Sequence, residues 1–77
     1  MKDRIKKVLS EVLDLELSEV NDEFSQKTCG KWDSLNHLNI VIAFEEEFDI
    51  SLEPEEISIM TNFKKIKEII KRKRNEL

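Results

Sequence analysis

Apolar residues near the start of the chain recur at the spacing of an α-helix. They lie three or four residues apart from Ile5 to Leu13, and charged side chains fill positions between them. This pattern predicts an amphipathic helix over about residues 2–15. A similar spacing of isoleucines near the end predicts a last helix, whose first turn Thr61 or Asn62 caps.

The middle of the chain predicts a longer helix that starts at Asp33 or Ser34 and ends near Phe48. Asp and Ser side chains both accept hydrogen bonds from the free N–H groups of a first helical turn. The apolar residues of this helix cover more than one stripe, so some of them must lie near the surface or line a pocket. After a short connection, Pro54 suits the first position of a short third helix that ends near Ile59.

The connection between the first two long helices, about residues 16–33, is long for a compact domain. Its isolated apolar residues, Leu17, Val20 and Phe24, are expected to anchor it to the core. No segment shows the alternation of a β-strand. The expected fold is therefore all-α: a four-helix bundle with three longer helices and one short third helix.

The length of 77 residues allows one domain, residues 1–77, with a single small core. Its last residues, about 71–77, are expected to form a basic tail that is frayed and solvated. A chain of this size favours a scaffold that presents one or two groups to larger partners. We expect no autonomous enzyme, because the sequence offers no Ser-His-Asp set and no phosphate-binding Gly-rich loop.

Charge is distributed unevenly along the chain, which has a net charge of −4. Residues 32–62 contain eight acids and no Lys or Arg, whereas the remainder holds thirteen bases and nine acids. An acidic surface attracts basic partners and repels nucleic acid. A nucleic-acid binder that uses the basic run of Lys64, Lys65, Lys67 and residues 71–74 is therefore the weaker alternative.

Composition also bears on location and on thiol chemistry. Cys29 is the only cysteine, so no internal disulfide can form. The longest apolar run, residues 40–44, is too short to span a bilayer, and the first residues are too charged for a secretory signal. We expect a cytoplasmic protein without membrane insertion. One Cys and one His, Cys29 and His37, cannot complete a metal site, and we interpret their presence as incidental.

The most informative residues are Asp33-Ser34-Leu35, where the long connection meets the second helix. Taken alone, this serine is interpreted as a helix cap. A serine hydroxyl at the start of a helix also lies where backbone N–H groups and the helix dipole favour a phosphate. His37, one turn later on roughly the same face, is expected either to bind such a phosphate when protonated or to be a half-exposed surface residue.

In this setting the chain resembles the acyl carrier protein family. Asp33-Ser34-Leu35 looks like the family's attachment motif, and residues 43–50 resemble the acidic end of its second helix and the loop that follows. Pro54-Glu55-Glu56 and Thr61-Asn62-Phe63 resemble the starts of its last two helices. The similarity extends from about residue 2 to about residue 70.

The resemblance implies a carrier that catalyses nothing itself. A separate phosphopantetheinyl transferase, using coenzyme A and Mg²⁺, would attach 4′-phosphopantetheine to Ser34, with Asp33, Leu35 and His37 beside the attachment point. The thiol of this arm would carry an acyl or aminoacyl group as a thioester from a loading ligase to downstream transferases or synthases. The carrier is expected to be a monomer.

The resemblance also implies which residues meet partners and which line the interior. The expected partner surface follows the second helix and comprises Asp33, Leu35, Asn36, Asn39, Ile42, Glu45 and Glu46. The interior, which in this family can open to shelter an acyl chain, would be lined by Ile40, Phe44, Phe48, Ile50 and Ile59. Plain core packing is the alternative for these five residues.

The chain departs from the fatty-acid carriers in two places. Lys31-Trp32 precedes the motif where those carriers usually have Gly-Ala, and Asn36 and Asn39 stand where they commonly have acids. The Trp-Asp-Ser-Leu form looks more like free-standing carriers of specialised pathways, such as surface-polysaccharide, aminoacyl or secondary-metabolite assembly. An aminoacyl or peptidyl carrier and an unmodified carrier-like adaptor stay open as alternatives. Trp32 is expected either to pack over the loop or to join the partner surface.

Overall fold

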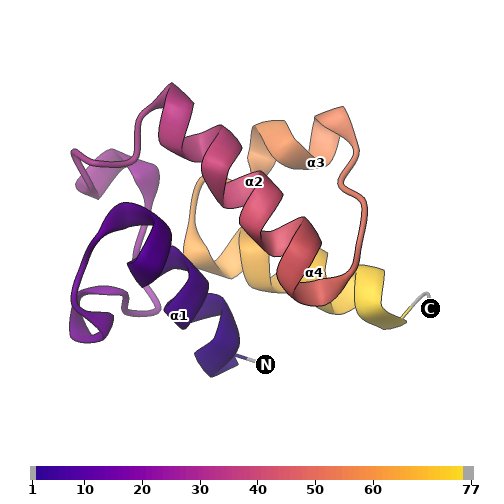
Figure 1. Ribbon diagram of the computed structural model, residues 1–77, viewed down its shortest axis with the longest axis horizontal. Helices are drawn as coiled ribbons and strands as arrows, with labels where there is room; N and C mark the ends of the chain where they lie inside the picture. The colour runs from indigo at the N-terminus through magenta and orange to yellow at the C-terminus, as the bar shows by residue number, and fades with distance from the viewer. Residues whose placement is uncertain (1, 76–77) are drawn as a thin grey trace.

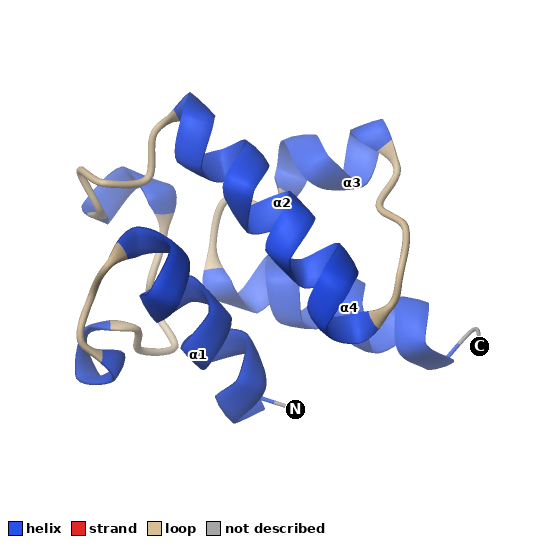
Figure 2. Ribbon diagram, viewed as in Figure 1, coloured by secondary structure: helices blue, strands red, loops and turns tan. Residues whose placement is uncertain are grey.

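The computed structural model describes residues 2–75, and this part of the chain folds into four α-helices and no strand (Figures 1 and 2). The helices are α1 (Lys2–Leu13), α2 (Ser34–Phe48), α3 (Pro54–Ile59) and α4 (Phe63–Asn75), with two short 3₁₀ turns, η1 (Leu17–Glu19) and η2 (Gln26–Thr28), between α1 and α2. The predicted all-α fold is confirmed. None of the helices within residues 2–75 is long and apolar enough to cross a membrane.

Helices α1 and α2 run antiparallel, and α4 lies behind them (Figure 1). Arg4, at the start of α1, donates hydrogen bonds of 3.0 Å from Nη2 to the carbonyl and to Oε2 of Glu47 at the end of α2. The apolar stripes of the three long helices meet in one core. Its fully buried residues include Ile5 and Leu9 of α1, Ile40, Phe44 and Phe48 of α2, and Phe63, Ile66 and Ile70 of α4.

The long connection between α1 and α2 is anchored by two of its three predicted apolar residues. Val20 and Phe24 are buried, whereas the side chain of Leu17 is 53% exposed, so its predicted anchoring role is wrong. The carbonyl of Phe24 accepts a hydrogen bond of 2.9 Å from the N–H of Phe63, the first residue of α4. The N–H of Gln26 donates a second bond to the carbonyl of Thr61, just before α4. The connection is therefore fixed to the start of α4 by backbone as well as by side chains.

The C-terminal residues differ from the predicted frayed tail. Residues 71–75 continue α4, and three of their side chains, those of Arg72, Lys73 and Arg74, reach other helices. The Arg72 guanidinium and the Lys73 ammonium each lie 2.9 Å from the Glu56 carboxylate of α3, and Arg74 Nη1 donates to the carbonyl of Phe48. The basic residues are ordered because acceptors on α2 and α3 hold them; the predicted tail at residues 76–77 lies outside the described residues.

Glu56 is the ionic link between α3 and α4. Burial raises the pKa of its carboxyl, but the hydrogen bonds from the Glu53 N–H, Lys73 and Arg72 outweigh burial and hold the pKa below its ordinary value of 4.5. Because the folded state then binds this proton more weakly than the unfolded state does, the ionised carboxylate stabilises the fold. That contribution is complete above about pH 4.5 and is lost as the pH falls through the lowered pKa.

The variant Glu56→Gln is expected to lower the free energy of unfolding at pH 7 by about 1 kcal/mol, since it keeps an acceptor but removes the charge. Urea titrations followed by circular dichroism at pH 7 and again below pH 4 measure the difference from the original protein, which should shrink at the acidic pH. Glu55→Gln, on the exposed side of α3, is the matched control and should have little effect at either pH. An undiminished effect of Glu56→Gln in acid would contradict the ionic role.

Candidate functional site

Ser34 is the first residue of α2 and is exposed to solvent. Asp33 performs the capping, because its Oδ1 accepts a hydrogen bond of 2.8 Å from the N–H of Asn36. Within residues 2–75 the Ser34 hydroxyl consequently forms no hydrogen bond, and the N–H groups of Ser34 and Leu35 have no partner there. An exposed, unengaged hydroxyl thus stands beside two free donors at the positive end of a fifteen-residue helix.

The backbone just before Ser34 is held by one side chain from the long connection and one from α2. Gln26 Nε2 donates to the carbonyl of Trp32 over 3.1 Å, and Asn36 Nδ2 donates to the carbonyl of Lys31 over 2.7 Å. Lys31 in turn donates from Nζ to the carbonyl of Asp14, near the end of α1. The serine therefore projects from a junction whose backbone is fixed rather than from a free loop.

Trp32 packs inside the protein, which decides between its two predicted roles. Its side chain is 2% exposed, and its ring stacks on Phe24 with a centroid separation of 5.6 Å. The aromatic pair fills the space between the long connection and the start of α2. Trp32 is thus a core residue that immediately precedes the Asp-Ser-Leu motif, and it does not belong to an exposed partner surface.

The structure does not place a free ring nitrogen of His37 at Ser34, which is at odds with the predicted phosphate contact. Its Nδ1 lies 3.0 Å from Trp32 Nε1, and its Nε2 lies 2.8 Å from the carbonyl oxygen of Ile57. Both ring nitrogens are engaged inside the protein, and the ring is half-buried between α2 and α3. Helical spacing predicts only that His37 and Ser34 lie on roughly the same face of α2. It does not reveal that Trp32 and Ile57 lie within hydrogen-bond distance of the His37 ring.

The front of α2 presents a largely apolar surface without ionised groups. Leu35 is 69% exposed, and Leu38 and Ile42 are more than half exposed. From Ser34 to Phe44 the helix carries no Asp, Glu, Lys or Arg. Neighbouring amides hydrogen-bond to each other, since Asn39 Nδ2 donates to Asn36 Oδ1. The exposed face nearest Ser34 therefore combines aliphatic side chains with uncharged amides.

The seven residues of the predicted partner surface do not all lie equally open. Asp33, Leu35, Asn39, Ile42 and Glu46 are exposed, whereas Asn36 and Glu45 are half-buried. Glu45 also has an internal role, because its Oε2 accepts a hydrogen bond of 2.9 Å from the N–H of Leu52 in the loop after α2. Charge on this face is thus confined to its two ends.

Most of the predicted interior residues are buried, with one exception. Ile40, Phe44 and Phe48 are fully buried, and Ile50 packs against the core. Ile59 is 47% exposed on α3, so its predicted place in the interior is wrong. Its exposure extends the apolar surface from α2 onto the end of α3.

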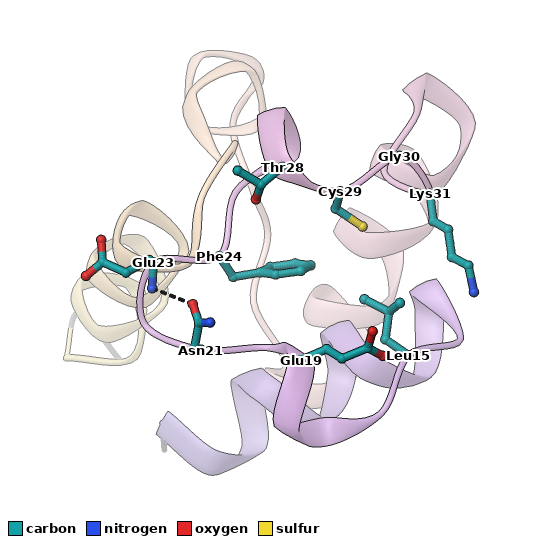
Figure 3. Close-up of a pocket in the computed structure, with 9 residues that line it drawn as sticks. All are labelled: Leu15, Glu19, Asn21, Glu23, Phe24, Thr28, Cys29, Gly30 and Lys31. Carbon is teal, nitrogen blue, oxygen red and sulfur yellow. Dashed lines mark hydrogen bonds between the residues drawn. The ribbon is translucent and has the colours of Figure 1, made fainter.

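A separate hollow of about 470 Å³ lies between the end of α1 and the long connection (Figure 3). Leu15, Phe24 and Cys29 line its apolar part, and Lys31 stands at its edge. Cys29 is buried, and no hydrogen bond from His37 reaches it, because both nitrogens of that ring are used elsewhere. A Cys-His nucleophile is therefore not assembled here, in line with the incidental interpretation of Cys29.

Comparison with known proteins gives relatives that are named acyl carrier proteins. The chain is 33% identical over 69 residues to an acyl carrier protein of Buchnera aphidicola subsp. Baizongia pistaciae, an alignment that covers 90% of this chain and 88% of that protein. It is 32% identical over 73 residues to an acyl carrier protein of Buchnera aphidicola subsp. Acyrthosiphon pisum, covering 95% and 91%. No known family model matches the chain.

Proposed function

The chain belongs to the acyl carrier protein family, and from this premise we propose that it holds a 4′-phosphopantetheine arm on Ser34 and carries an acyl or aminoacyl group on that arm. The observation that carries the proposal is the state of Ser34, whose hydroxyl is exposed and unengaged at the start of α2. When bound, the arm supplies a terminal thiol that holds its cargo as a thioester.

The residues around Ser34 fit a phosphodiester. The free N–H groups of Ser34 and Leu35 are donors that a phosphate oxygen accepts well, and the helix dipole favours the negative charge. Asp33 is already committed to the N–H of Asn36, so its carboxylate serves the helix. Among the described residues no unengaged base lies beside the hydroxyl, because both His37 nitrogens are bonded. As the family resemblance implies, we assign the attachment to a separate phosphopantetheinyl transferase with coenzyme A and Mg²⁺.

We further propose that the chain is a carrier of a specialised pathway, loaded by its own ligase in the cytoplasm. The surface around Ser34 supports the first part of this proposal. On the first part of α2, uncharged Asn36 and Asn39 stand where fatty-acid carriers commonly have acids, and exposed Leu35 and Ile42 lie beside them. Partners that recognise acidic helices by charge gain little from this face, since rim charges mainly determine association rate and selectivity. The partners proposed here are a loading ligase and downstream transferases or synthases that contact an apolar helix face.

Intact-mass measurement tests the attachment. The purified protein is incubated with a broad-specificity phosphopantetheinyl transferase, coenzyme A and Mg²⁺, and fragmentation locates the added group. We expect a gain of one phosphopantetheine unit, located on Ser34. No gain with several transferases, on a protein shown to be folded, would favour the unmodified adaptor.

Leu35 offers a test of the partner surface. Replacing this exposed leucine by alanine is expected to slow modification of Ser34 about tenfold, the effect of losing roughly 1.4 kcal/mol of contact in the complex with the transferase. Leu17→Ala is the matched control, because Leu17 is similarly exposed but lies on η1. Equal rates for the two variants would argue against Leu35 as a contact, and thermal unfolding should be unchanged in both.

A further inference from the structure

The hydrogen bonds of His37 fix the protonation state of its ring. Trp32 Nε1–H can only donate, so His37 Nδ1, at 3.0 Å, must accept and carries no proton. The carbonyl of Ile57 can only accept, so His37 Nε2, at 2.8 Å, must donate. The folded protein therefore holds the neutral Nε2–H tautomer, and the ring bridges an obligate donor and an obligate acceptor.

This bridge joins three segments that are distant in the sequence. Trp32 belongs to the loop immediately before Ser34, His37 to α2 and Ile57 to α3. The His37 and Trp32 rings are also stacked, with centroids 6.1 Å apart, and the indole is buried against Phe24 on its other side. The buried indole N–H of Trp32, in the loop before Ser34, thus has an acceptor only while the His37 imidazole is neutral.

We propose that His37 is a positioning residue that ties the loop before Ser34 to α3 only while its ring is neutral. Protonation adds a hydrogen to Nδ1 and places it against the indole N–H, so the bond to Trp32 is lost. The Nε2–H bond to Ile57 is kept, because that nitrogen donates in both forms. Acidification therefore removes the tie between this loop and α3 that runs through His37, while the bond from His37 to Ile57 still joins α2 and α3.

No acidic side chain in the described residues bonds to the ring to retain the charged form. The titratable groups on the segments that contact His37 are Cys29, Lys31 and Asp33 near Trp32, Glu53 at the N-cap of α3, and Glu55 and Glu56 on α3. The Asp33 carboxylate holds the N–H of Asn36, and Glu56 binds Arg72 and Lys73. The two hydrogen-bond partners of the imidazole, the Trp32 indole and the Ile57 carbonyl, are uncharged. The hydrogen bond to the indole therefore depends on whether the ring is neutral or protonated.

One NMR titration tests this inference on the unmodified chain, so its result is independent of the carrier proposal. Trp32 and His37 are the only Trp and His, and each gives a single set of ring signals. From pH 8 downward, until the imidazole protonates, we expect the indole N–H signal to shift in step with the imidazole signals. Its protection against exchange with water, relative to a free indole at the same pH, should fall about tenfold, as a buried hydrogen bond is lost. The amide signals of α3 should change far less.

The variant His37→Gln is the control that separates protonation from packing. A glutamine offers one acceptor and one donor at similar reach but does not titrate, so the indole signal should become independent of pH. An indole signal that stays constant while the imidazole of the original protein titrates would overturn the inference. It would also be overturned if the imidazole protonated only on global unfolding and both proteins unfolded at the same pH.

Discussion

Replacing Ser34 by alanine is expected to abolish the gain of one phosphopantetheine unit completely, because the attachment needs the hydroxyl oxygen. The change should leave the fold intact. Asp33 supplies the cap, the Ser34 hydroxyl has no hydrogen bond within the described residues, and alanine is the best helix former. Intact mass after incubation with transferase, coenzyme A and Mg²⁺ is the measurement, and thermal unfolding followed by circular dichroism checks the fold.

Ser18→Ala is the matched control for this experiment. Ser18 is also an exposed serine, but it lies in η1 and does not begin a long helix. The Ser18 variant should be modified as fast as the original protein. A Ser34→Ala protein that still gained the unit would show that another hydroxyl is the acceptor and would overturn the assignment of the arm to Ser34.

Replacing Phe48 by alanine is expected to have the largest effect on stability, a loss of about 3–5 kcal/mol. Phe48 is fully buried at the end of α2 and stacks on Phe44 with centroids 6.1 Å apart. The guanidinium of Arg4 lies 4.6 Å from the centre of its ring, and that of Arg74 lies 5.9 Å from it. Truncation would therefore leave a cavity where α1, α2 and α4 meet.

Urea unfolding followed by circular dichroism measures this loss. Small domains are stable by only about 5–15 kcal/mol, so Phe48→Ala is expected to unfold at much lower urea concentration or to be unfolded without urea. Phe48→Leu, with a smaller cavity, gives a second value if the alanine variant does not fold. Ile59→Ala, on the half-exposed end of α3, should change stability by less than about 0.5 kcal/mol. Similar losses for Phe48→Ala and Ile59→Ala would contradict the packing described here.

Local sequence signals predicted the helices well because each signal acts over a few residues. The apolar spacing in the first helix, the acceptor side chain of Asp33 and the fixed backbone of Pro54 all act within one or two turns. The same holds for Asn62, whose Oδ1 accepts from the N–H of Lys65 at the start of α4. The position of Ser34 at the first residue of a helix follows from these local signals, and only the family resemblance gives that position a chemical meaning.

The errors concern contacts between residues far apart in the chain. The basic end of α4 has the composition of a frayed tail, and it is ordered because Glu56, sixteen residues before Arg72, accepts from it. His37 was placed by its spacing from Ser34, whereas Ile57, twenty residues later, decides where its ring points. Leu17 is apolar like Val20 and Phe24 in the same connection, but only those two are buried. Contacts between residues so far apart in the chain produce no periodic pattern in the sequence, so periodicity cannot predict them.

The attachment of α3 by side chains of other helices has a consequence for the order of folding. Isolated helices of six residues are far too short to persist in water, because forming the first turn is unfavourable. The main polar contacts of α3 are the hydrogen bond between His37 of α2 and the Ile57 carbonyl, and the ion pairs of Glu56 with Arg72 and Lys73 of α4. These ties exist only after α2 and α4 have formed and approached each other. We therefore expect α3 to gain its structure last during folding and to lose it first in local unfolding.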